Sequence, residues 1–340
     1  MWYDQQGRLL PWRIRPEDRV RGMIPDPYAV WLSEIMLQQT TVTHATPYWQ
    51  RFLAEFPTII DLANAERERV LEMWAGLGYY ARGRNLHRCA RLIRDEHGGV
   101  FPSEEKDLLK LPGIGPYTAA AMAAICFGQA TNVVDGNVER VISRLCAVQT
   151  FLPKGRKDIW GRAGELVRSE RAADYPQALM DLGGTICTPK NPKCDQCPLQ
   201  NYCSVFGRDD IETYPKKQKK KPSPQRFGAI FVLISGDYVL MEKRADKGLL
   251  GGMLGFPGSD WTEALPSDPL SYAPMHRNWE KLDVAVRHIF THFDLTLSVY
   301  RAQCAHTEPD LGLWVPIDAL PVKALPTLMK KVARIGKLDE

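Results

Sequence analysis

The sequence predicts an α + (α+β) protein: a helical domain over residues 1–206, a linker over 207–226 and a smaller α+β domain over 227–340. Apolar residues recur at spacings of three and four through most of the first range, as they do on one face of an amphipathic helix. The linker is rich in lysine and proline, and the last range contains stretches in which apolar and polar residues alternate as in strands. A chain of 340 residues is long enough for two or three domains.

Eight segments of the first domain carry the helical spacing, and glycine or proline marks most of the joins between them. These segments are 28–41, 44–55, 67–76, 84–97, 105–111, 116–127, 137–147 and 158–169. Strand-like alternation is not found among them, so the domain is predicted to be almost entirely helical.

The linker is predicted from its composition, because it contains almost no apolar residues. In the second domain, two apolar segments flank Ser235-Gly236, and this arrangement predicts a β-hairpin. The expected elements are strands at 227–234 and 237–244, a half-buried strand through Phe293, Leu295, Leu297 and Val299, a strand at 311–317, and a helix within 318–335.

Composition and charge argue against a membrane or secreted protein. The longest apolar run, 119–127, is far shorter than the ~20 residues that cross a bilayer. The N-terminus has no basic stretch followed by an apolar one, so no secretory signal is recognised. The net charge of +4 comes from lysines between residues 216 and 221, while the chain before them is neutral overall. We therefore expect an intracellular protein in which any affinity for nucleic acid depends on locally arranged groups.

Four of the eight cysteines follow the pattern Cys187-x6-Cys194-x2-Cys197-x5-Cys203. In a reducing compartment such a group favours a metal site over disulfides. Four thiolates bind either a zinc ion or an iron–sulfur cluster, and the spacing by itself leaves both possibilities open.

Residues 111–118 read Leu-Pro-Gly-Ile-Gly-Pro-Tyr-Thr, a tight turn that leads into an alanine-rich helix. Gly113 and Gly115 allow the backbone to turn sharply and to bring its N–H groups close to a ligand. The N-terminus of the helix adds a partial positive charge, so a phosphate would be well placed there. An ordinary connection between two helices is the alternative.

Asp135 and Glu34 are the two carboxylates that we expect to take part in chemistry. Asp135 precedes a predicted helix, where its ordinary role is an N-cap, and the amide hydrogen bonds of a cap also favour the charged carboxylate. Glu34 lies off the apolar stripe of its helix, which is compatible with a solvated position, but Val30, Trp31 and Leu37 surround it. Apolar neighbours favour the neutral carboxyl group that a general acid needs.

The cysteine pattern resembles the [4Fe–4S] loop of the endonuclease III-like glycosylases, and residues 111–118 resemble the helix-hairpin-helix motif of the same superfamily. Residues 28–40 resemble the adenine-pocket helix of the MutY family of adenine DNA glycosylases, and the likeness extends over nearly the whole chain. The resemblance implies a two-lobed helical glycosylase domain that includes the cluster loop at 187–203, followed by a Nudix-like domain that recognises the lesion.

The same resemblance implies an activity. The family members flip adenine out of A·8-oxoguanine mispairs in duplex DNA, and less well out of A·G mispairs, and hydrolyse its bond to the sugar. We expect a monomeric, monofunctional enzyme with a [4Fe–4S] cofactor, in which Glu34 protonates the adenine and Asp135 stabilises the positive charge on the sugar. Without an obvious organelle presequence, a cytoplasmic, bacterial-type enzyme that associates with the nucleoid through DNA is favoured.

The family motifs assign roles to further residues. Gln39 and Tyr79 match the residues that wedge into the base stack, and Trp12 and Arg13 match residues that line the adenine pocket. The segment 14–24 is longer than is usual in the family, which leaves the orientation of Arg13 open. Candidates for phosphate contacts, with a solvated helix face as the alternative, are Arg82, Arg84, Arg88 and Arg91.

In the second domain, Phe290, Thr291 and His292 match a Phe-Ser-His loop that contacts 8-oxoguanine. Threonine replaces serine here, but the hydroxyl group is kept. We expect Phe290 to stack beside the base, and the hydroxyl or imidazole group to distinguish the oxidised base.

Three other functions are compatible with parts of the sequence. A bifunctional endonuclease III-like glycosylase/lyase needs a lysine in the hairpin helix to form a Schiff base, and Tyr117 occupies that position. A Nudix hydrolase needs clustered glutamates for its divalent metal, and no Arg-Glu-x-x-Glu-Glu string occurs after residue 222. A non-catalytic iron–sulfur module is disfavoured because Glu34 and Asp135 are both present.

Overall fold

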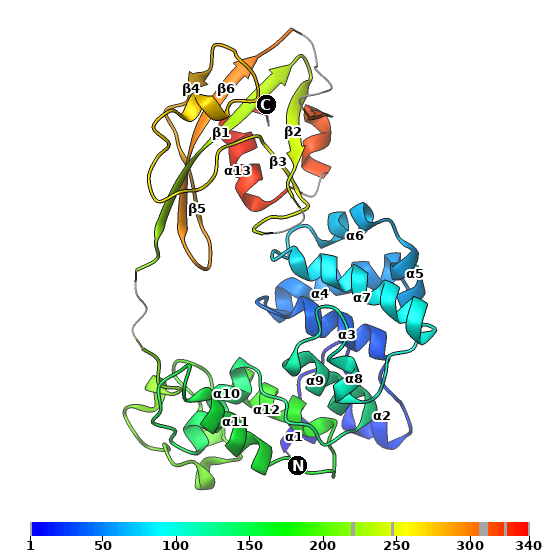
Figure 1. The fold of residues 1–340 in the computed structure, drawn as a ribbon. Coiled ribbons are helices and arrows are strands. Elements are labelled where there is room, and N and C mark those ends of the chain that lie inside the picture. The colour runs from blue at the N-terminus through cyan, green and yellow to red at the C-terminus, as the bar shows by residue number, and fades with distance from the viewer. Residues whose placement is uncertain (1, 219–221, 246–247, 306–311, 323–324, 339–340) are drawn as a thin grey trace. The chain divides into compact units, whose positions relative to one another are not determined.

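The computed structural model describes residues 2–218, 222–245, 248–305, 312–322 and 325–338 (Figure 1). The chain folds into two units. Unit 1 comprises Met1–Ala65 and Asn85–Lys220, and unit 2 comprises Glu66–Arg84 and Lys221–Glu340. Unit 2 therefore includes a short helical segment from the first third of the chain, which the sequence analysis did not anticipate. Within the described ranges, no helix has both the length and the apolar character that crossing a membrane requires.

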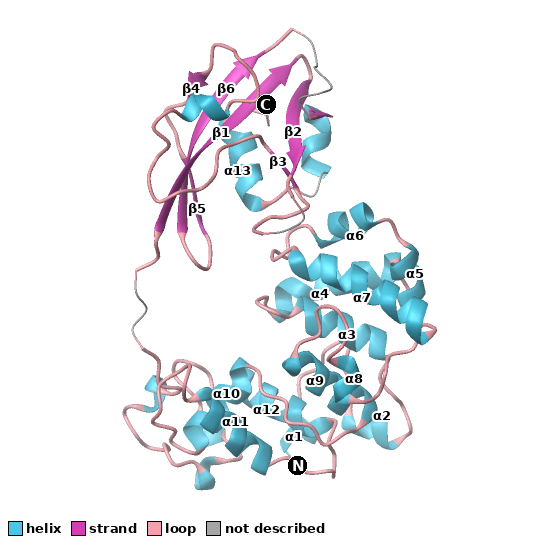
Figure 2. Cartoon of the chain, in the orientation of Figure 1, coloured by secondary structure: helices cyan, strands magenta, loops and turns pink. Residues whose placement is uncertain are grey.

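Unit 1 is helical (Figure 2). Its helices are α1 (Trp2–Gln6), α2 (Pro16–Val20), α3 (Pro27–Met36), α4 (Val42–Glu55), α5 (Ile59–Asn64), most of α7 (Ala81–His97), α8 (Glu105–Leu108), α9 (Pro116–Phe127), α10 (Gly136–Leu145), α11 (Arg156–Glu165) and α12 (Asp174–Thr185). Three 3-10 turns follow, namely η1 (Cys194–Gln196), η2 (Gln200–Tyr202) and η3 (Ile211–Thr213).

Local sequence signals begin and end several of these helices. The side chains of Asp26 and Thr41 accept hydrogen bonds from backbone N–H groups in the first turns of α3 and α4. Thr58 and Asp61 form a capping box at α5. Gly128, in the left-handed conformation, ends α9.

Each of the eight segments predicted to be helical contains a helix, with ends that differ by a few residues. The prediction for 28–41 extends too far, because α3 ends at Met36 and is followed by a turn in which Gln39 has a φ of 59°. The sequence pattern did not predict α1, α2, α5 and α12. In α12, Pro176 and two adjacent glycines weaken the local helical signal, and packing against α10 stabilises the helix instead.

Helix α9 lies in the core of unit 1. Its residues from Thr118 to Ile125 are all buried, and a helix that is apolar on every side needs neighbours all around it. It packs against α3, α8 and α12, and its alanines allow these neighbours to approach closely. This packing fixes the first turn of α9, which carries Tyr117.

The first part of the predicted linker packs against unit 1. Tyr214 is 2% exposed, and its hydroxyl group accepts a hydrogen bond from Gln149 at 2.6 Å. The backbone N–H of Leu152 donates to the carbonyl of Lys216. Residues 219–221 lie outside the described residues, and the first strand begins at Gln225. The stretch available to connect the two units is therefore shorter than composition predicted.

The C-terminal part of unit 2 is a mixed seven-stranded sheet with the order β3-β2-β1-β6-β4, in which β5 also pairs with β6 and β7 with β2. The strands are β1 (Gln225–Ser235), β2 (Tyr238–Lys243), β3 (Leu254–Gly255), β4 (Glu280–Lys281), β5 (Val286–Ile289), β6 (Asp294–Gln303) and β7 (Leu313–Pro316). The remaining elements of unit 2 are helix α6 (Arg67–Trp74), the start of α7, the 3-10 turns η4 (Pro269–Tyr272) and η6 (Ile317–Val322), and helix α13 (Thr327–Ile335).

The predicted elements of this region are confirmed. Strands β1 and β2 form the hairpin about Ser235-Gly236, and β6 alternates as expected, with Leu295, Leu297 and Val299 buried. The strand predicted at 311–317 is β7, although Leu311 lies outside the described residues. Strands β1 and β6 run parallel over ten residue pairs, which the sequence pattern did not predict. A helical unit and a mixed-sheet unit confirm the α + (α+β) class.

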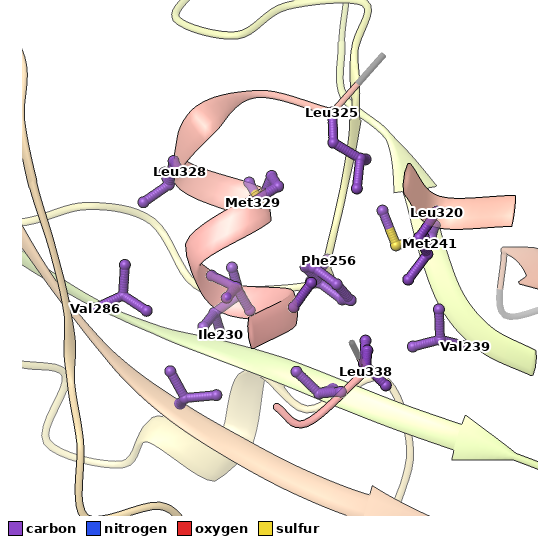
Figure 3. Close-up of a cluster of buried hydrophobic side chains, with 14 of the residues drawn as sticks. Ile230, Val239, Met241, Phe256, Val286, Leu320, Leu325, Leu328, Met329 and Leu338 are labelled. Carbon is purple, nitrogen blue, oxygen red and sulfur yellow. The ribbon is translucent and has the colours of Figure 1, made fainter. Parts of the chain in front are cut away.

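Helix α13 packs its apolar face onto the sheet (Figure 3). Leu328 and Met329 of the helix lie in one buried cluster with Phe256 and with Ile230 and Val239 of the central strands. Along one edge of the unit, Glu68 of α6 forms an ion pair with Lys243 of β2 at 3.2 Å. Contacts of this kind join the segment Glu66–Arg84 to the C-terminal part of the chain.

Candidate active site

A cavity of about 740 Å³ opens in unit 1 and is lined by residues of α3, α9, α10, α11 and α12 and of the N-terminal segment. Its volume is in the range of small-molecule sites and is sufficient for a nucleobase. Six of the residues predicted from the sequence line it, namely Trp12, Arg13, Glu34, Gln39, Tyr117 and Asp135.

Glu34 is buried on α3, with 6% of its surface exposed. Burial raises the pKa of its carboxyl group from 4.5 to about 6, although a hydrogen bond from Tyr117 and the nearby charge of Arg13 partly oppose this. The hydroxyl group of Tyr117 donates that bond to Oε2 at 2.8 Å. The apolar surroundings expected from the sequence are therefore present, and the solvated alternative is wrong.

Asp135 is the N-cap of α10 and is half-buried. Its Oδ1 accepts hydrogen bonds from the backbone N–H groups of Asn137 and Val138 at 2.9 and 2.7 Å, and its Oδ2 accepts one from Nδ2 of Asn137 at 2.7 Å. These three donors fix the position of the carboxylate at the start of α10. The predicted cap is thus present in the wall of the same cavity as Glu34.

Asn137 is itself held in place by α12 and by an arginine. A Cβ atom on Gly183 would lie 2.6 Å from Cβ of Asn137, so only glycine allows α12 to come this close. Arg140 donates to Oδ1 of Asn137 at 3.0 Å and to the backbone carbonyl of Cys187 at 2.7 Å. The cysteine loop is therefore linked to Asp135 through two side chains.

Arg13 is oriented by Asp181, a residue that the sequence analysis missed. Asp181 is completely buried on α12 and accepts hydrogen bonds from Nη1 of Arg13 at 2.7 Å and from the backbone N–H of Arg8 at 2.7 Å. The orientation of Arg13 is thus defined despite the long segment 14–24. The sequence does contain a signal for this buried residue, because Asp181 interrupts an otherwise apolar stretch, Ala-Leu-Met-Asp-Leu. Trp12, which precedes Arg13 in the sequence, is buried. Its ring packs edge-on against that of Trp49, with the ring centroids 5.6 Å apart.

The four predicted metal ligands line one small cavity. Cys187, Cys194, Cys197 and Cys203 surround it together with apolar side chains and the guanidinium of Arg144. Arg144 is 1% exposed and donates to Sγ of Cys187 at 3.4 Å and to the carbonyl of Thr188 at 2.7 Å. Among the described residues, no three potential ligands are grouped as one metal ion would require. Four cysteine thiols that line one cavity are a ligand set for either an iron–sulfur cluster or a zinc ion.

The predicted hairpin is a turn between α8 and α9. Gly113 has a φ of 79°, and a Cβ atom there would lie 2.8 Å from Cβ of Asn85. Gly115 is the N-cap of α9, with open space where a Cβ atom would stand. Within the part of the chain that the structure describes, the N–H groups of these two glycines donate to no backbone carbonyl. They are available to a phosphate oxygen at a helix N-terminus.

The two predicted wedge residues, Gln39 in unit 1 and Tyr79 in unit 2, share an unusual backbone conformation. Their φ angles are 59° and 47°, a region that residues other than glycine rarely adopt and that clusters at functional sites. Both side chains are exposed, Tyr79 to 51%. The hydroxyl group of Tyr79 lies 3.0 Å from the hydroxyl oxygen of Thr291.

Thr291 and His292 are exposed at the tip of the β5–β6 hairpin, which is closed by a bond from the N–H of Phe290 to the carbonyl of Phe293. Phe290 does not extend from this tip as expected. Its ring stacks on Trp261 at 5.7 Å and contacts the ring of Phe293 at 5.0 Å, because a cluster of aromatic side chains supports the hairpin from inside. Stacking by Phe290 on a base would require it to leave this cluster.

Two of the four candidate arginines for phosphate contacts donate hydrogen bonds to backbone carbonyls of the protein. Arg82 donates to the carbonyls of Leu77 and Gly78, and Arg84 donates to the carbonyl of Gly251. Arg88 and Arg91 are exposed on α7, which is compatible with a phosphate contact and with a solvated helix face.

Three family models match parts of the chain. Residues 32–162 match the HhH-GPD superfamily of base excision DNA repair proteins, residues 187–203 match the iron–sulfur binding domain of endonuclease III, and residues 229–334 match a NUDIX domain. The middle match covers the four cysteines and identifies the cofactor as an iron–sulfur cluster rather than zinc.

Curated relatives cover the whole chain. The human adenine DNA glycosylase is 35% identical over 98% of this chain and 72% of its own length. The adenine DNA glycosylase of Buchnera aphidicola subsp. Schizaphis graminum is 30% identical over 99% and 96%. Since mammals, plants and bacteria are all represented, the relatives do not indicate a bacterial source. Among solved structures, a thermostable thymine-DNA glycosylase is 28% identical, covers 60% of this chain and 91% of its own, and has a TM-score of 0.51.

Proposed function

The chain belongs to the adenine DNA glycosylase family, and from this premise we propose that its substrate is adenine paired with 8-oxoguanine or guanine, with Glu34 and Asp135 as the catalytic pair. The enzyme is a DNA N-glycosylase of base excision repair that binds DNA and carries a [4Fe–4S] cluster. The opposing base, the roles of individual residues and the domain boundaries at 206 and 227 are parts of the proposal.

The observation that carries the proposal is the pair of carboxylates in one cavity with opposite surroundings. Glu34 is buried and has a pKa of about 6, so a useful fraction remains protonated near neutral pH. Asp135 accepts three hydrogen bonds from N–H groups, which hold its carboxylate in the wall of the cavity. One neutral acid and one fixed anion are what cleavage of a glycosidic bond through an oxocarbenium-like transition state requires.

The reaction follows from these two environments. The adenine anion is a poor leaving group, so Glu34 transfers its proton to a ring nitrogen while the bond to C1′ of the sugar breaks and its electron pair passes to the base. The carboxylate of Asp135 stabilises the positive charge that develops on the sugar. Water then adds to C1′ and loses a proton, which leaves an abasic strand.

Tyr117 supports this chemistry without joining it covalently. Its hydroxyl group orients the carboxyl group of Glu34. A phenol cannot form the Schiff base that a lyase step needs, so the geometry supports a monofunctional enzyme.

Recognition of the mispair is assigned to exposed groups. Thr291 and His292 at the hairpin tip supply a hydroxyl and an imidazole group that can distinguish 8-oxoguanine from guanine by hydrogen bonds. Gln39 and Tyr79 are the proposed wedges, because their planar groups can fill the gap that a flipped base leaves. The backbone N–H groups of Gly113 and Gly115 are proposed to bind a backbone phosphate.

The test is single-turnover adenine release from duplexes that contain A·8-oxoguanine, A·G or A·T. We expect Glu34→Gln to lose between about a hundredfold and about ten-thousandfold in rate, because glutamine keeps the shape but has no proton to transfer. Asp135→Asn should lose a similar amount, since asparagine still caps α10 but carries no charge. Binding of both variants to the duplex should stay within about tenfold of the wild type.

The matched control is Glu104→Gln, which neutralises a carboxylate outside the cavity and should cleave at the wild-type rate. Substantial cleavage by Glu34→Gln would contradict its role as the acid. Equal rates on A·T and A·8-oxoguanine would contradict the proposed mispair.

A further inference from the structure

We infer that Arg82 is a positioning residue for the wedge: it holds the turn of residues 76–79 in the conformation that presents the ring of Tyr79. The inference rests on the proposed role of Tyr79. Arg82 acts on DNA through the tyrosine, and its guanidinium group binds the protein rather than a phosphate.

The turn has a conformation that needs external support. Gly76, Gly78 and Tyr79 all have positive φ angles, of 103°, 69° and 47°. The two glycines adopt positive φ angles at little energetic cost, whereas the same conformation is strained in Tyr79 because of its Cβ atom. Such conformations persist only when surrounding contacts enforce them.

Arg82 supplies those contacts from the first turn of α7. Its Nη2 donates to the carbonyls of Leu77 and Gly78 at 3.0 and 3.3 Å. Its backbone N–H donates to the carbonyl of Tyr79 at 2.8 Å. One residue thus binds three consecutive carbonyls of the turn.

The guanidinium group also contacts two aromatic rings. Its carbon lies 5.4 Å from the ring centroid of Trp74 and 5.4 Å from that of Tyr79, which is within the range of cation–π attraction. Burial lowers the pKa of Arg82 to about 10, so the group is partly withdrawn from water yet charged at neutral pH.

Trp74 anchors this arrangement. It is completely buried, and its Nε1 donates to the carbonyl of Gly78 at 3.0 Å. A Cβ atom on Gly83 would lie 2.9 Å from Cγ of Trp74, so the helix that carries Arg82 packs directly on the indole. Arg82 is therefore fixed on one side by the indole and supports the wedge on the other.

Arginine is required by this geometry. Its planar fork reaches two carbonyls and lies flat against rings, whereas lysine is a point charge that would reach one carbonyl at most. Lysine would nevertheless keep any attraction to a phosphate. Arg82→Lys therefore separates the positioning role from a direct phosphate contact.

The experiment compares Tyr79→Ala, Arg82→Lys and the double variant in the full-length, iron-loaded protein. Unstacking is read from 2-aminopurine fluorescence beside an A·8-oxoguanine mispair, and adenine release from single-turnover rates. We expect Arg82→Lys to reduce both, with a rate loss between about tenfold and about a hundredfold. The double variant should lose no more than Tyr79→Ala alone, because the arginine acts through the tyrosine.

The salt dependence of duplex binding distinguishes the alternative. A positioning role leaves the slope of log K against log salt unchanged in Arg82→Met, whereas loss of a phosphate contact lowers it by about one. The control is Arg69→Lys on α6, an arginine whose ion-pair partner is Glu72 and which should behave as wild type. Thermal melts and iron content verify folding, and if Arg82→Lys does not fold, Arg82→Met replaces it in the cycle.

The outcomes separate the two proposals. If Tyr79→Ala unstacks the bases beside the mispair as fully as the wild type does, Tyr79 is not the wedge and the proposed function is contradicted at that residue. A normal Arg82→Lys beside an impaired Tyr79→Ala, additive losses in the double variant, or a reduced salt slope would each overturn the inference about Arg82 alone.

Discussion

The pKa of Glu34 should determine how adenine release depends on pH. A general acid works only in its protonated form, so the rate should be constant below about pH 6 and fall about tenfold for each pH unit above it. At pH 7.5 a carboxyl group with a pKa of 6 is about 3% protonated, whereas one at the ordinary value of 4.5 is about 0.1% protonated. Burial thus increases the active form about thirtyfold at working pH.

The hydrogen bond from Tyr117 opposes this effect, and Tyr117→Phe removes it. The bond stabilises the charged carboxylate, so its loss should raise the pKa of Glu34 further. A hydrogen bond to a charged group contributes about 1.5 kcal/mol, which corresponds to about one pH unit. The midpoint of the profile should therefore move from about 6 to about 7, while the plateau falls if the carboxyl group is less well oriented.

The assay is the single-turnover rate on an A·8-oxoguanine duplex, measured from about pH 5 to about pH 9. Tyr175→Phe is the control, because it removes a tyrosine hydroxyl group of the same unit that is not bonded to Glu34. A midpoint in Tyr117→Phe that stays in place or moves to lower pH would refute the electrostatic account of Glu34.

Four further outcomes are expected. Above pH 6, Glu34→Gln should be more stable than the wild type by about 2 kcal/mol, and below pH 4.5 the two should be equally stable. The reason is that the raised pKa of Glu34 lowers the stability of the wild type as the pH rises from 4.5 to about 6. Equal melting temperatures at pH 7.5 would contradict this. Purified protein should be yellow-brown and hold about four irons, and one zinc without iron would show that the cluster assignment is wrong. Borohydride should trap little protein–DNA adduct, because Tyr117 replaces the lyase lysine; efficient trapping would reveal another amine nucleophile. Thr291→Val and His292→Ala should each lower the ratio of A·8-oxoguanine to A·G cleavage about tenfold, and unchanged ratios would place lesion reading elsewhere.

Much of the chemistry could be predicted because its signals are local. The spacing of the cysteines is given directly by the sequence, so the cluster loop at 187–203 could be predicted without knowledge of the fold. Gly113 and the alanine-rich helix after it specify a turn and a helix start within a few residues. Asp135 caps a helix through its immediate neighbours, and Glu34 is surrounded by apolar residues one turn away. The features at Gly113, Asp135 and Glu34 each depend on backbone geometry within about one helical turn.

Other features of the protein depend on contacts between distant segments. Stacking of Phe290 on a base stays a prediction, and the structure shows that its ring contacts those of Trp261 and Phe293. Composition marks residues 207–226 as a linker, and the structure shows in addition that Tyr214 within this range is buried in unit 1. Arg82 was one candidate for a phosphate contact, and in the structure its side chain donates to the carbonyls of Leu77 and Gly78. Composition and periodicity describe what a segment can bury, but they do not identify the partner that covers it.

The sequence by itself determined most of the elements in chain order, the two candidate carboxylates and, through its motifs, the family and its cofactor. Only the tertiary structure decided how the site is oriented and supported. Asp181 fixes Arg13 across 168 positions of the chain, and Tyr117 holds Glu34 across 83. Glu66–Arg84 joins unit 2 although its neighbours in sequence belong to unit 1. The physical reason is that such contacts depend on which surfaces meet when the whole chain packs, and no local spacing encodes that choice.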